Sequence, residues 1–161
     1  MTVAIRAANL SDLESLQRIE TAAFSSEKYP LTSQAQFQRL LNKAKNIELF
    51  VATRRSEVVG YILLFYRSNS QWGRLYSIAV HPDSQGSDVG KRLFDFAEQR
   101  ILKRKLKGLT LEIREDNQRH FERYLKRGYV QVAEVSDYYP DGAAAIKRAK
   151  CFRKRLTDGI D

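Results

Sequence analysis

Cysteine and histidine are scarce in this sequence. One cysteine and two histidines occur among 161 residues. The single thiol, Cys151, cannot form a disulfide within the chain, and so few ligands fit no recognised zinc-binding spacing. The sequence therefore predicts neither a disulfide framework nor a metal site. Cys151 falls on the last predicted strand, where we expect a buried and inert thiol.

Long apolar runs are also missing. No segment approaches the ~20 apolar residues that a membrane-spanning helix needs, and residues 1–10 lack the basic and apolar blocks of a signal peptide. Hydrophobic residues make up 43% and charged residues 29% of the chain, which is ordinary for a globular domain. We expect one cytoplasmic domain over residues 1–155, a polar tail over residues 156–161, and no membrane partner.

Acidic residues are in deficit. The chain has 28 Lys and Arg against 19 Asp and Glu, a formal charge of +9, and much of the excess lies within residues 100–107 and 147–155. Such charge favours anionic partners, such as cofactor phosphates, acidic peptides or RNA, through long-range attraction. No aromatic residues alternate with the basic ones as in an RNA-binding motif, so a solvated basic face explains the two clusters equally well.

The apolar pattern alternates between helix and strand periods. Expected helices carry apolar residues three and four positions apart, and they cover residues 11–23, 32–44, 89–105 and 118–127. Expected strands are rich in β-branched and aromatic residues, and they cover residues 3–6, 48–53, 58–66, 73–80, 109–114, 129–135 and 144–152. The sequence therefore predicts an α/β fold with a mixed sheet of about six to seven strands and about four helices.

One strand-loop-helix segment suits phosphate binding. An apolar strand ends at His81, a polar loop with Gly86 and Gly90 follows, and a helix begins near Val89. The first N–H groups of a helix are unpaired and carry partial positive charge, and glycine lets an anion approach the backbone closely. The pattern alone is weak evidence, because many strand-to-helix turns contain glycine.

The order of elements and four short motifs resemble the GNAT superfamily of N-acetyltransferases, and among them the bacterial ribosomal-protein alanine N-acetyltransferases. The motifs are residues 85–90, residues 111–114 with Asn117, residues 124–129 and residues 137–142. The resemblance implies a single domain with a mostly antiparallel central sheet flanked by helices. It also implies direct acetyl transfer from acetyl-CoA, the expected co-substrate, to a primary amine, with no metal.

The resemblance implies catalytic roles for two residues. Glu112 corresponds to the general base, which takes a proton from the amine directly or through water, and Tyr124 to the general acid, which protonates the departing thiolate. The residues alone leave alternatives. Glu112 could be a solvent-side strand residue paired with Arg114 or with a neighbouring strand, and Tyr124 could be a core residue in an apolar helix stripe.

The resemblance also implies binding residues. Ile78, Ala79 and Val80 lie where family members bind the thioester and pantetheine arm along a splayed strand. The pyrophosphate would be surrounded by Gln85, Gly86, Ser87, Asp88, Val89, Gly90 and Lys91. Asn117 would contact CoA, although its default role is that of a helix cap. Tyr138 and Tyr139 would line the acceptor site.

Asp88 stands where the family pattern usually has a glycine. Aspartate tolerates the left-handed backbone conformation better than most residues, so the loop could keep its shape. A carboxylate facing the pyrophosphate would cost roughly 1 kcal/mol per charge pair in water, and less if it turns to solvent or pairs with Lys91 or Arg92. We expect acetyl-CoA to bind, but more weakly than in a glycine-bearing relative.

The sequence leaves the acceptor open. The resemblance favours a protein or peptide N-terminal α-amine, whose pKa of about 7.7–8.0, against about 10.4 for lysine, makes deprotonation easier near neutral pH. One alternative is a small amine such as a polyamine, an antibiotic or an amino acid. Another is a catalytically weak module that binds the ribosome or RNA, although nucleic acid is the less favoured partner. A monomer or a small homo-oligomer is expected.

Overall fold

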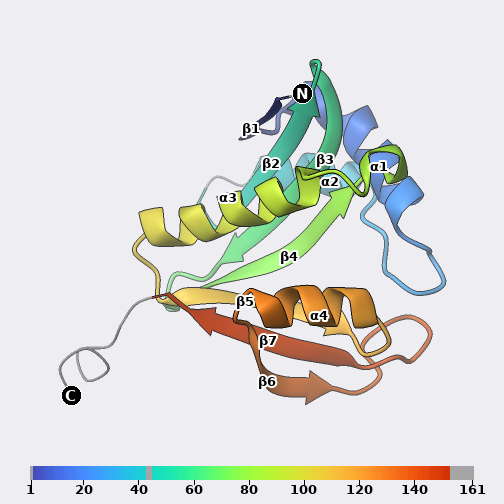
Figure 1. The fold of residues 1–161 in the computed structure, drawn as a ribbon. Coiled ribbons are helices and arrows are strands. Elements are labelled where there is room, and N and C mark those ends of the chain that lie inside the picture. Colours follow the sequence, from blue (N-terminus) through green and yellow to red (C-terminus); the bar gives the residue numbers. More distant parts are fainter. Residues whose placement is uncertain (1, 43–44, 153–161) are drawn as a thin grey trace.

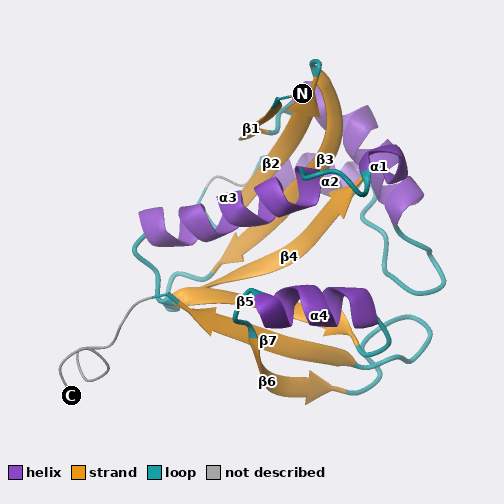
Figure 2. Ribbon diagram, viewed as in Figure 1, coloured by secondary structure: helices purple, strands orange, loops and turns teal. Residues whose placement is uncertain are grey.

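The computed structural model describes residues 2–42 and 45–152, which form one sheet with helices on both faces (Figures 1 and 2). The strands are β1 (Val3–Ala7), β2 (Ile47–Arg54), β3 (Glu57–Tyr66), β4 (Trp72–Val80), β5 (Gly108–Arg114), β6 (Val130–Val135) and β7 (Ala145–Cys151). The α-helices are α1 (Leu13–Ala23), α2 (Gln34–Leu41), α3 (Val89–Lys103) and α4 (Gln118–Lys126). The predicted α/β class is confirmed. The predicted tail, residues 156–161, lies outside the described residues.

The strands are arranged in the order β1-β2-β3-β4-β5-β7-β6. β4 and β5 run parallel and the other neighbours run antiparallel, so the predicted mixed, mostly antiparallel sheet is confirmed. β3 is buried on both faces because its side chains alternate between two cores. Tyr61 and Leu63 lie in the core with α1 and α2, whereas Ile62 and Leu64 lie in the core with α3 and α4.

Local side chains define where the first two helices begin. Ser33 caps α2, and its hydroxyl and the Gln36 side chain each accept a backbone N–H from the other residue. Asp12 is the residue before α1, and its side chain makes no cap bond to that helix. Asn9 caps a short 3-10 turn that leads into α1, and Asp12 accepts the Asn9 N–H at 2.9 Å and a bond from Arg6 at 2.8 Å.

The start of α3 is held close over the sheet. A Cβ atom on Gly60 of β3 would lie 2.9 Å from the Ala79 carbonyl oxygen and 3.1 Å from Cδ1 of Leu93, so a larger residue would push α3 away. Val89 and Leu93 are fully buried on the helix face that meets the sheet. This packing fixes the first turn of α3 beside the end of β4, where the phosphate loop was predicted.

β4 and β5 separate after a short stretch of pairing. Their parallel ladder joins residues 72–75 to residues 108–111 and goes no further. On its other side, β4 has a bulge: Leu75 pairs with Leu64 and Ser77 with Leu63, which leaves Tyr76 as an extra residue. A bulge bends its strand and re-aims the side chains that follow. The two strands therefore diverge beyond this ladder (Figure 1), and residues of both strands line a pocket.

Several members of the two basic clusters have partners inside the protein. Arg100 of α3 and Arg104, the residue after that helix, pair with Glu48 of β2, and Lys150 pairs with Glu98. Arg148 is buried and donates to the Tyr129 carbonyl at 2.9 Å. These charged groups hold elements of the protein together. The basic surface that is left to attract an anionic partner is therefore smaller than the composition implies. Residues 153–155 of the second cluster lie outside the described residues.

The expectation that Cys151 is buried was wrong. The thiol is exposed at the end of β7, because the residue opposite it on β5 is Gly108, which has no side chain to cover it. Within residues 2–42 and 45–152, no helix is long and apolar enough to cross a membrane. The same residues contain no group of three His, Cys, Asp or Glu side chains that could hold a metal ion.

Candidate active site

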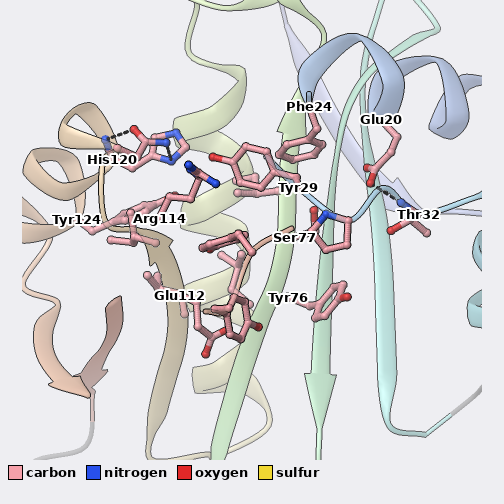
Figure 3. Close-up of a pocket in the computed structure, with 18 residues that line it drawn as sticks. Glu20, Phe24, Tyr29, Thr32, Tyr76, Ser77, Glu112, Arg114, His120 and Tyr124 are labelled. Atoms are coloured by element: carbon pink, nitrogen blue, oxygen red, sulfur yellow. Dashed lines mark hydrogen bonds between the residues drawn. The ribbon is translucent and has the colours of Figure 1, made fainter. Parts of the chain in front are cut away.

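A pocket of about 130 Å³ occupies the opening between β4 and β5 (Figure 3). Eighteen residues line it, from five parts of the chain. They are Glu20, Phe24, Tyr29, Pro30 and Thr32 around the end of α1, Leu75–Ile78 of β4, Leu111–Arg114 of β5, Asn117, His120 and Tyr124 of α4, and Tyr138 and Tyr139 between β6 and β7. The structure thus brings Glu112, Tyr124, Asn117, Ile78, Tyr138 and Tyr139 to one pocket, and their roles there stay predictions.

Glu112 is held by an arginine of the neighbouring strand. Nε and Nη2 of Arg74 donate to Oε1 of Glu112 at 3.1 and 2.9 Å. Nη2 also donates to the Tyr138 hydroxyl at 3.0 Å. The neighbouring-strand pairing that the sequence left open is therefore present, and the pairing with Arg114 is not. Among the described residues Oε2 of Glu112 has no hydrogen-bond partner, so one carboxylate oxygen can still serve a ligand.

Tyr124 belongs both to the core and to the pocket. Its side chain is 5% exposed and packs against Phe94, with ring centroids 5.1 Å apart, while it also lines the pocket. Burial raises the pKa of its phenol to about 12 because the phenolate is disfavoured away from water. The group is therefore protonated at neutral pH, as a proton donor must be.

His120 was missed by the sequence analysis. It lies one turn before Tyr124 on α4, and the two rings are 5.7 Å apart. Its backbone N–H donates to Oδ1 of Asn117 at 3.2 Å, which confirms Asn117 as the helix cap, and its Nδ1 lies 3.0 Å from Nδ2 of Asn117. Burial lowers the pKa of His120 to about 4, with smaller effects from Arg123 and Arg119. In the sequence, the (i, i+4) spacing between His120 and Tyr124 could have indicated that both side chains lie on one face of the helix.

Arg114 joins three loops at the mouth of the pocket. Its buried guanidinium donates to both oxygens of Asp116 and of Asp141, at 2.8–3.0 Å, and to the carbonyl of Lys28 at 3.0 Å. The rings of Tyr29 and Tyr139 flank it. Hydrogen bonding from Arg114 lowers the pKa of Asp141 to about 2. The loops before α2, before α4 and before β7 are therefore fixed relative to one another.

A second carboxylate, Glu20, lies at the opposite wall. It is 2% exposed and accepts the Thr32 N–H at 2.7 Å and the hydroxyl of Tyr61. The Tyr61 hydroxyl lies 2.8 Å from Oγ of Ser77 in β4. Both oxygens of Glu20 are thus engaged, and the carboxylate ties α1 to the following loop and to β3.

The predicted phosphate loop lies at the end of β4 and outside the pocket lining. Gly86 adopts a φ of +84°, and a Cβ atom there would meet no atom within 4 Å, so the space above it is open. The Gln85 side chain donates to the Val80 carbonyl at 3.0 Å, and Ser87 bonds the Ser84 carbonyl, which fixes the loop on the strand.

Asp88 does not need the left-handed conformation that the sequence analysis allowed for. Its φ is −89°, at the position just before α3. Its carboxylate is 61% exposed and lies 3.7 Å from Nε of Arg92, one of the pairings considered from the sequence. Lys91, the other candidate, pairs instead with Asp95. Ala79, Val80, Val89 and Gly90 flank this loop on the strand and the helix.

Comparisons with known proteins agree with this architecture. The chain matches the model of the acetyltransferase (GNAT) family over residues 13–129. The ribosomal-protein-S18-alanine N-acetyltransferase from Escherichia coli is 23% identical, with a TM-score of 0.84 over 96% of each chain. Ard1 from Thermoplasma volcanium is 25% identical, with a TM-score of 0.81 over 94% of this chain and 98% of that one.

A third solved structure has a different named substrate. It is described as a streptothricin acetyltransferase from Bacillus anthracis in complex with acetyl coenzyme A. The identity is 22% and the TM-score 0.74, over 95% of this chain and 100% of that one. Among curated protein sequences, none matches this chain. Identities this low establish a shared fold and leave the acceptor to be argued from the pocket itself.

Proposed function

This chain belongs to the acetyltransferase (GNAT) family, and from that premise we propose that it moves an acetyl group from acetyl-CoA to the α-amine of a protein or peptide N-terminus. The observation that carries the proposal is the pocket between the diverging strands, because Glu112 and Tyr124 both line it. The acetyl-transferring class follows from the family. The acceptor and the residue roles are our proposal.

The end of β4 and the start of α3 fit the cofactor. Open space above Gly86 and the unpaired first amides of α3 suit a pyrophosphate. Gln85, Gly86, Ser87, Asp88, Val89, Gly90 and Lys91 would surround it. Ile78, Ala79 and Val80 would offer backbone groups to the pantetheine arm, and Asn117 would lie beside it. Bound there, acetyl-CoA would supply the acetyl group and a thiolate leaving group.

Glu112 and Tyr124 would handle the protons of the reaction. Oε2 of Glu112 would take a proton from the amine, directly or through one water, so that the nitrogen lone pair can attack the thioester carbon. As the carbon–sulfur bond breaks, its electron pair leaves on sulfur and the phenol of Tyr124 would give its proton to that sulfur. The attached nitrogen then loses its second proton to solvent, the phenolate regains one from solvent, and Glu112 releases its proton to water. The products are an amide and free CoA.

The pocket favours an acceptor that inserts only one end. About 130 Å³ is less than the roughly 300–1,000 Å³ of pockets that enclose a whole small ligand. A peptide N-terminus needs room only for an amine and its first side chain, with Tyr138 and Tyr139 at the mouth. The net charge of +9 disfavours a polyamine, which is itself a polycation. A cytoplasmic location and the monomeric or oligomeric state stay predictions.

A panel of acceptors tests the proposal. Thiol release from acetyl-CoA is measured with peptides that differ in their first residue, with spermidine and with streptothricin. Each peptide has a copy that is blocked at its N-terminus and carries one lysine, and mass spectrometry locates the acetyl group. We expect acetylation of free N-termini and little reaction of the blocked copies. A higher kcat/KM for spermidine or streptothricin than for every peptide would contradict the proposed acceptor.

A further inference from the structure

His120 has one ring nitrogen fixed and one available. Its Nδ1 lies 3.0 Å from the Asn117 side-chain amide, and its Nε2 has no hydrogen-bond partner among the described residues. The ring lines the same pocket as Tyr124, one helical turn away (Figure 3). A polar group that lines a reaction pocket without a protein partner is a candidate to bind a ligand.

The cap of α4 determines which nitrogen carries the proton. Oδ1 of Asn117 accepts the His120 backbone N–H at 3.2 Å, so the other end of the amide, Nδ2, faces the ring. An amide nitrogen can only donate, and Nδ1 must therefore accept and carry no hydrogen. In the neutral imidazole the single N–H is then on Nε2. This pocket-lining ring thus carries one N–H donor that has no partner among the described residues.

We propose that His120, through its Nε2–H, donates a hydrogen bond to the sulfur of CoA and stabilises the negative charge that develops there as the thioester breaks. The proposal rests on the proposed function, because it assigns a further group to the same site. A fixed donor aimed at developing charge lowers the barrier of such a step. Tyr124 would still supply the proton.

The neutral state of the ring suits this role. The lowered pKa of about 4 means that His120 carries no charge at neutral pH, so it gives no fixed charge to the site before the reaction. The neutral ring keeps one N–H, which it can donate. His120 is therefore a second donor beside Tyr124 and not a competing acid.

Nitrogen NMR tests the tautomer without turnover. The chain has two histidines, so the imidazole signals are few. We expect the His120 ring to be neutral at pH 7 with its proton on Nε2, and the Nε2 signal to shift when CoA is added. Asn117→Asp keeps an oxygen for the helix cap but replaces the amide donor with an acceptor, so the proton should move to Nδ1. A wild-type proton on Nδ1 would overturn the proposal.

Calorimetry with CoA and with desulfo-CoA tests the partner. The wild type should bind CoA roughly fivefold more tightly than desulfo-CoA, and both His120→Ala and Asn117→Asp should lose that preference. In turnover, His120→Ala should lower kcat roughly 10–100-fold, and His120→Gln, which keeps an N–H donor, should recover part of it. Gln118→Ala, an exposed change on the same helical turn, is the matched control.

The outcomes separate this inference from the proposed function. If His120→Ala weakens CoA and desulfo-CoA equally, or if the wild type does not distinguish them, the sulfur is not the partner and the inference fails while the enzyme stands. If the wild type binds neither compound, the proposed function fails as well. A sulfur preference that disappears in both variants supports the inference whichever acceptor is used.

Discussion

The residues at the mouth of the pocket and those at its inner end differ in charge. At the mouth, charged groups are paired: Arg74 holds Glu112, and Arg114 holds Asp116 and Asp141. At the inner end, Tyr124 is buried and His120 is half-buried, and both are neutral, with pKa values of about 12 and about 4. The mouth uses ion pairs to fix its loops, whereas the inner end presents neutral side chains. Charge that develops at the inner end is then met by neutral donors.

Loss of Tyr124 should have the largest effect, because it removes the proton donor of the inner end. Tyr124→Phe keeps the ring, and we expect kcat to fall roughly 10²–10⁴-fold with little change in KM. Tyr129→Phe is the matched control, because Tyr129 is buried in the same aromatic cluster and bonds Glu98 but does not line the pocket. It should lower the melting temperature and leave kcat unchanged. An unchanged kcat in Tyr124→Phe would show that Tyr124 is not the proton donor.

Loss of Arg74 should disturb the mouth less severely. Arg74→Gln frees both Glu112 and the Tyr138 hydroxyl, so we expect kcat/KM for a peptide to fall roughly tenfold, mainly through a higher KM. Arg74→Lys keeps the charge but loses the two-nitrogen contact of the guanidinium with Glu112, so its kcat/KM should be intermediate. Arg67→Gln, a change at the exposed residue that follows β3, is the control. Equal kinetics for all three variants would show that the pairing is incidental.

Acid should affect the inner end before the mouth. The folded-state pKa of His120 is depressed from 6.5 to about 4, so the unfolded chain binds the extra proton first and stability falls as the pH drops from 6.5 to 4. The pKa of Asp141 is lowered to about 2, so its stabilising pairing is present above about 3.9 and is lost below that, toward pH 2. Melting temperatures of wild type, His120→Gln and Asp141→Asn across pH 2–7 separate the two ranges.

The smallest expected effect concerns the phosphate loop. The carboxylate of Asp88 is exposed and lies near Arg92, so its repulsion of a pyrophosphate is largely offset. Asp88→Gly should bind acetyl-CoA only slightly more tightly, by less than about fivefold in calorimetry. Equal affinities would rule out a repulsive role. A much larger gain would mean that the carboxylate turns toward the cofactor.

The sequence predicted elements better than pairings. Periodicity located β5 and α4 because Leu109, Leu111 and Ile113 alternate and because a cap precedes the helix. The partners of Glu112 could not be foreseen, since Arg74 is 38 residues away and meets it only through the parallel ladder of β4 and β5. Such a contact depends on register and on the bulge at Tyr76.

Burial of polar residues was also beyond the sequence. His120 stands among polar neighbours in a first helical turn, a pattern typical of solvent exposure, and only the divergence of β4 from β5 turns it toward a pocket. For Cys151 the prediction failed in the opposite direction: we expected burial, but the residue opposite is a glycine and the thiol is exposed. Both errors come from the neighbours across the sheet and not from the residues themselves.

The hydrogen bonds of Arg114 to three loops have a consequence for engineering. Because one guanidinium bonds the loops before α2, α4 and β7, exchange of a single loop with a homologue would separate Arg114 from one of its anchors. A transplant meant to redirect acceptor choice should therefore carry Asp116, Asp141 and the segment around Lys28 together. The three loops at the mouth of the pocket should therefore be exchanged as a set and not one at a time.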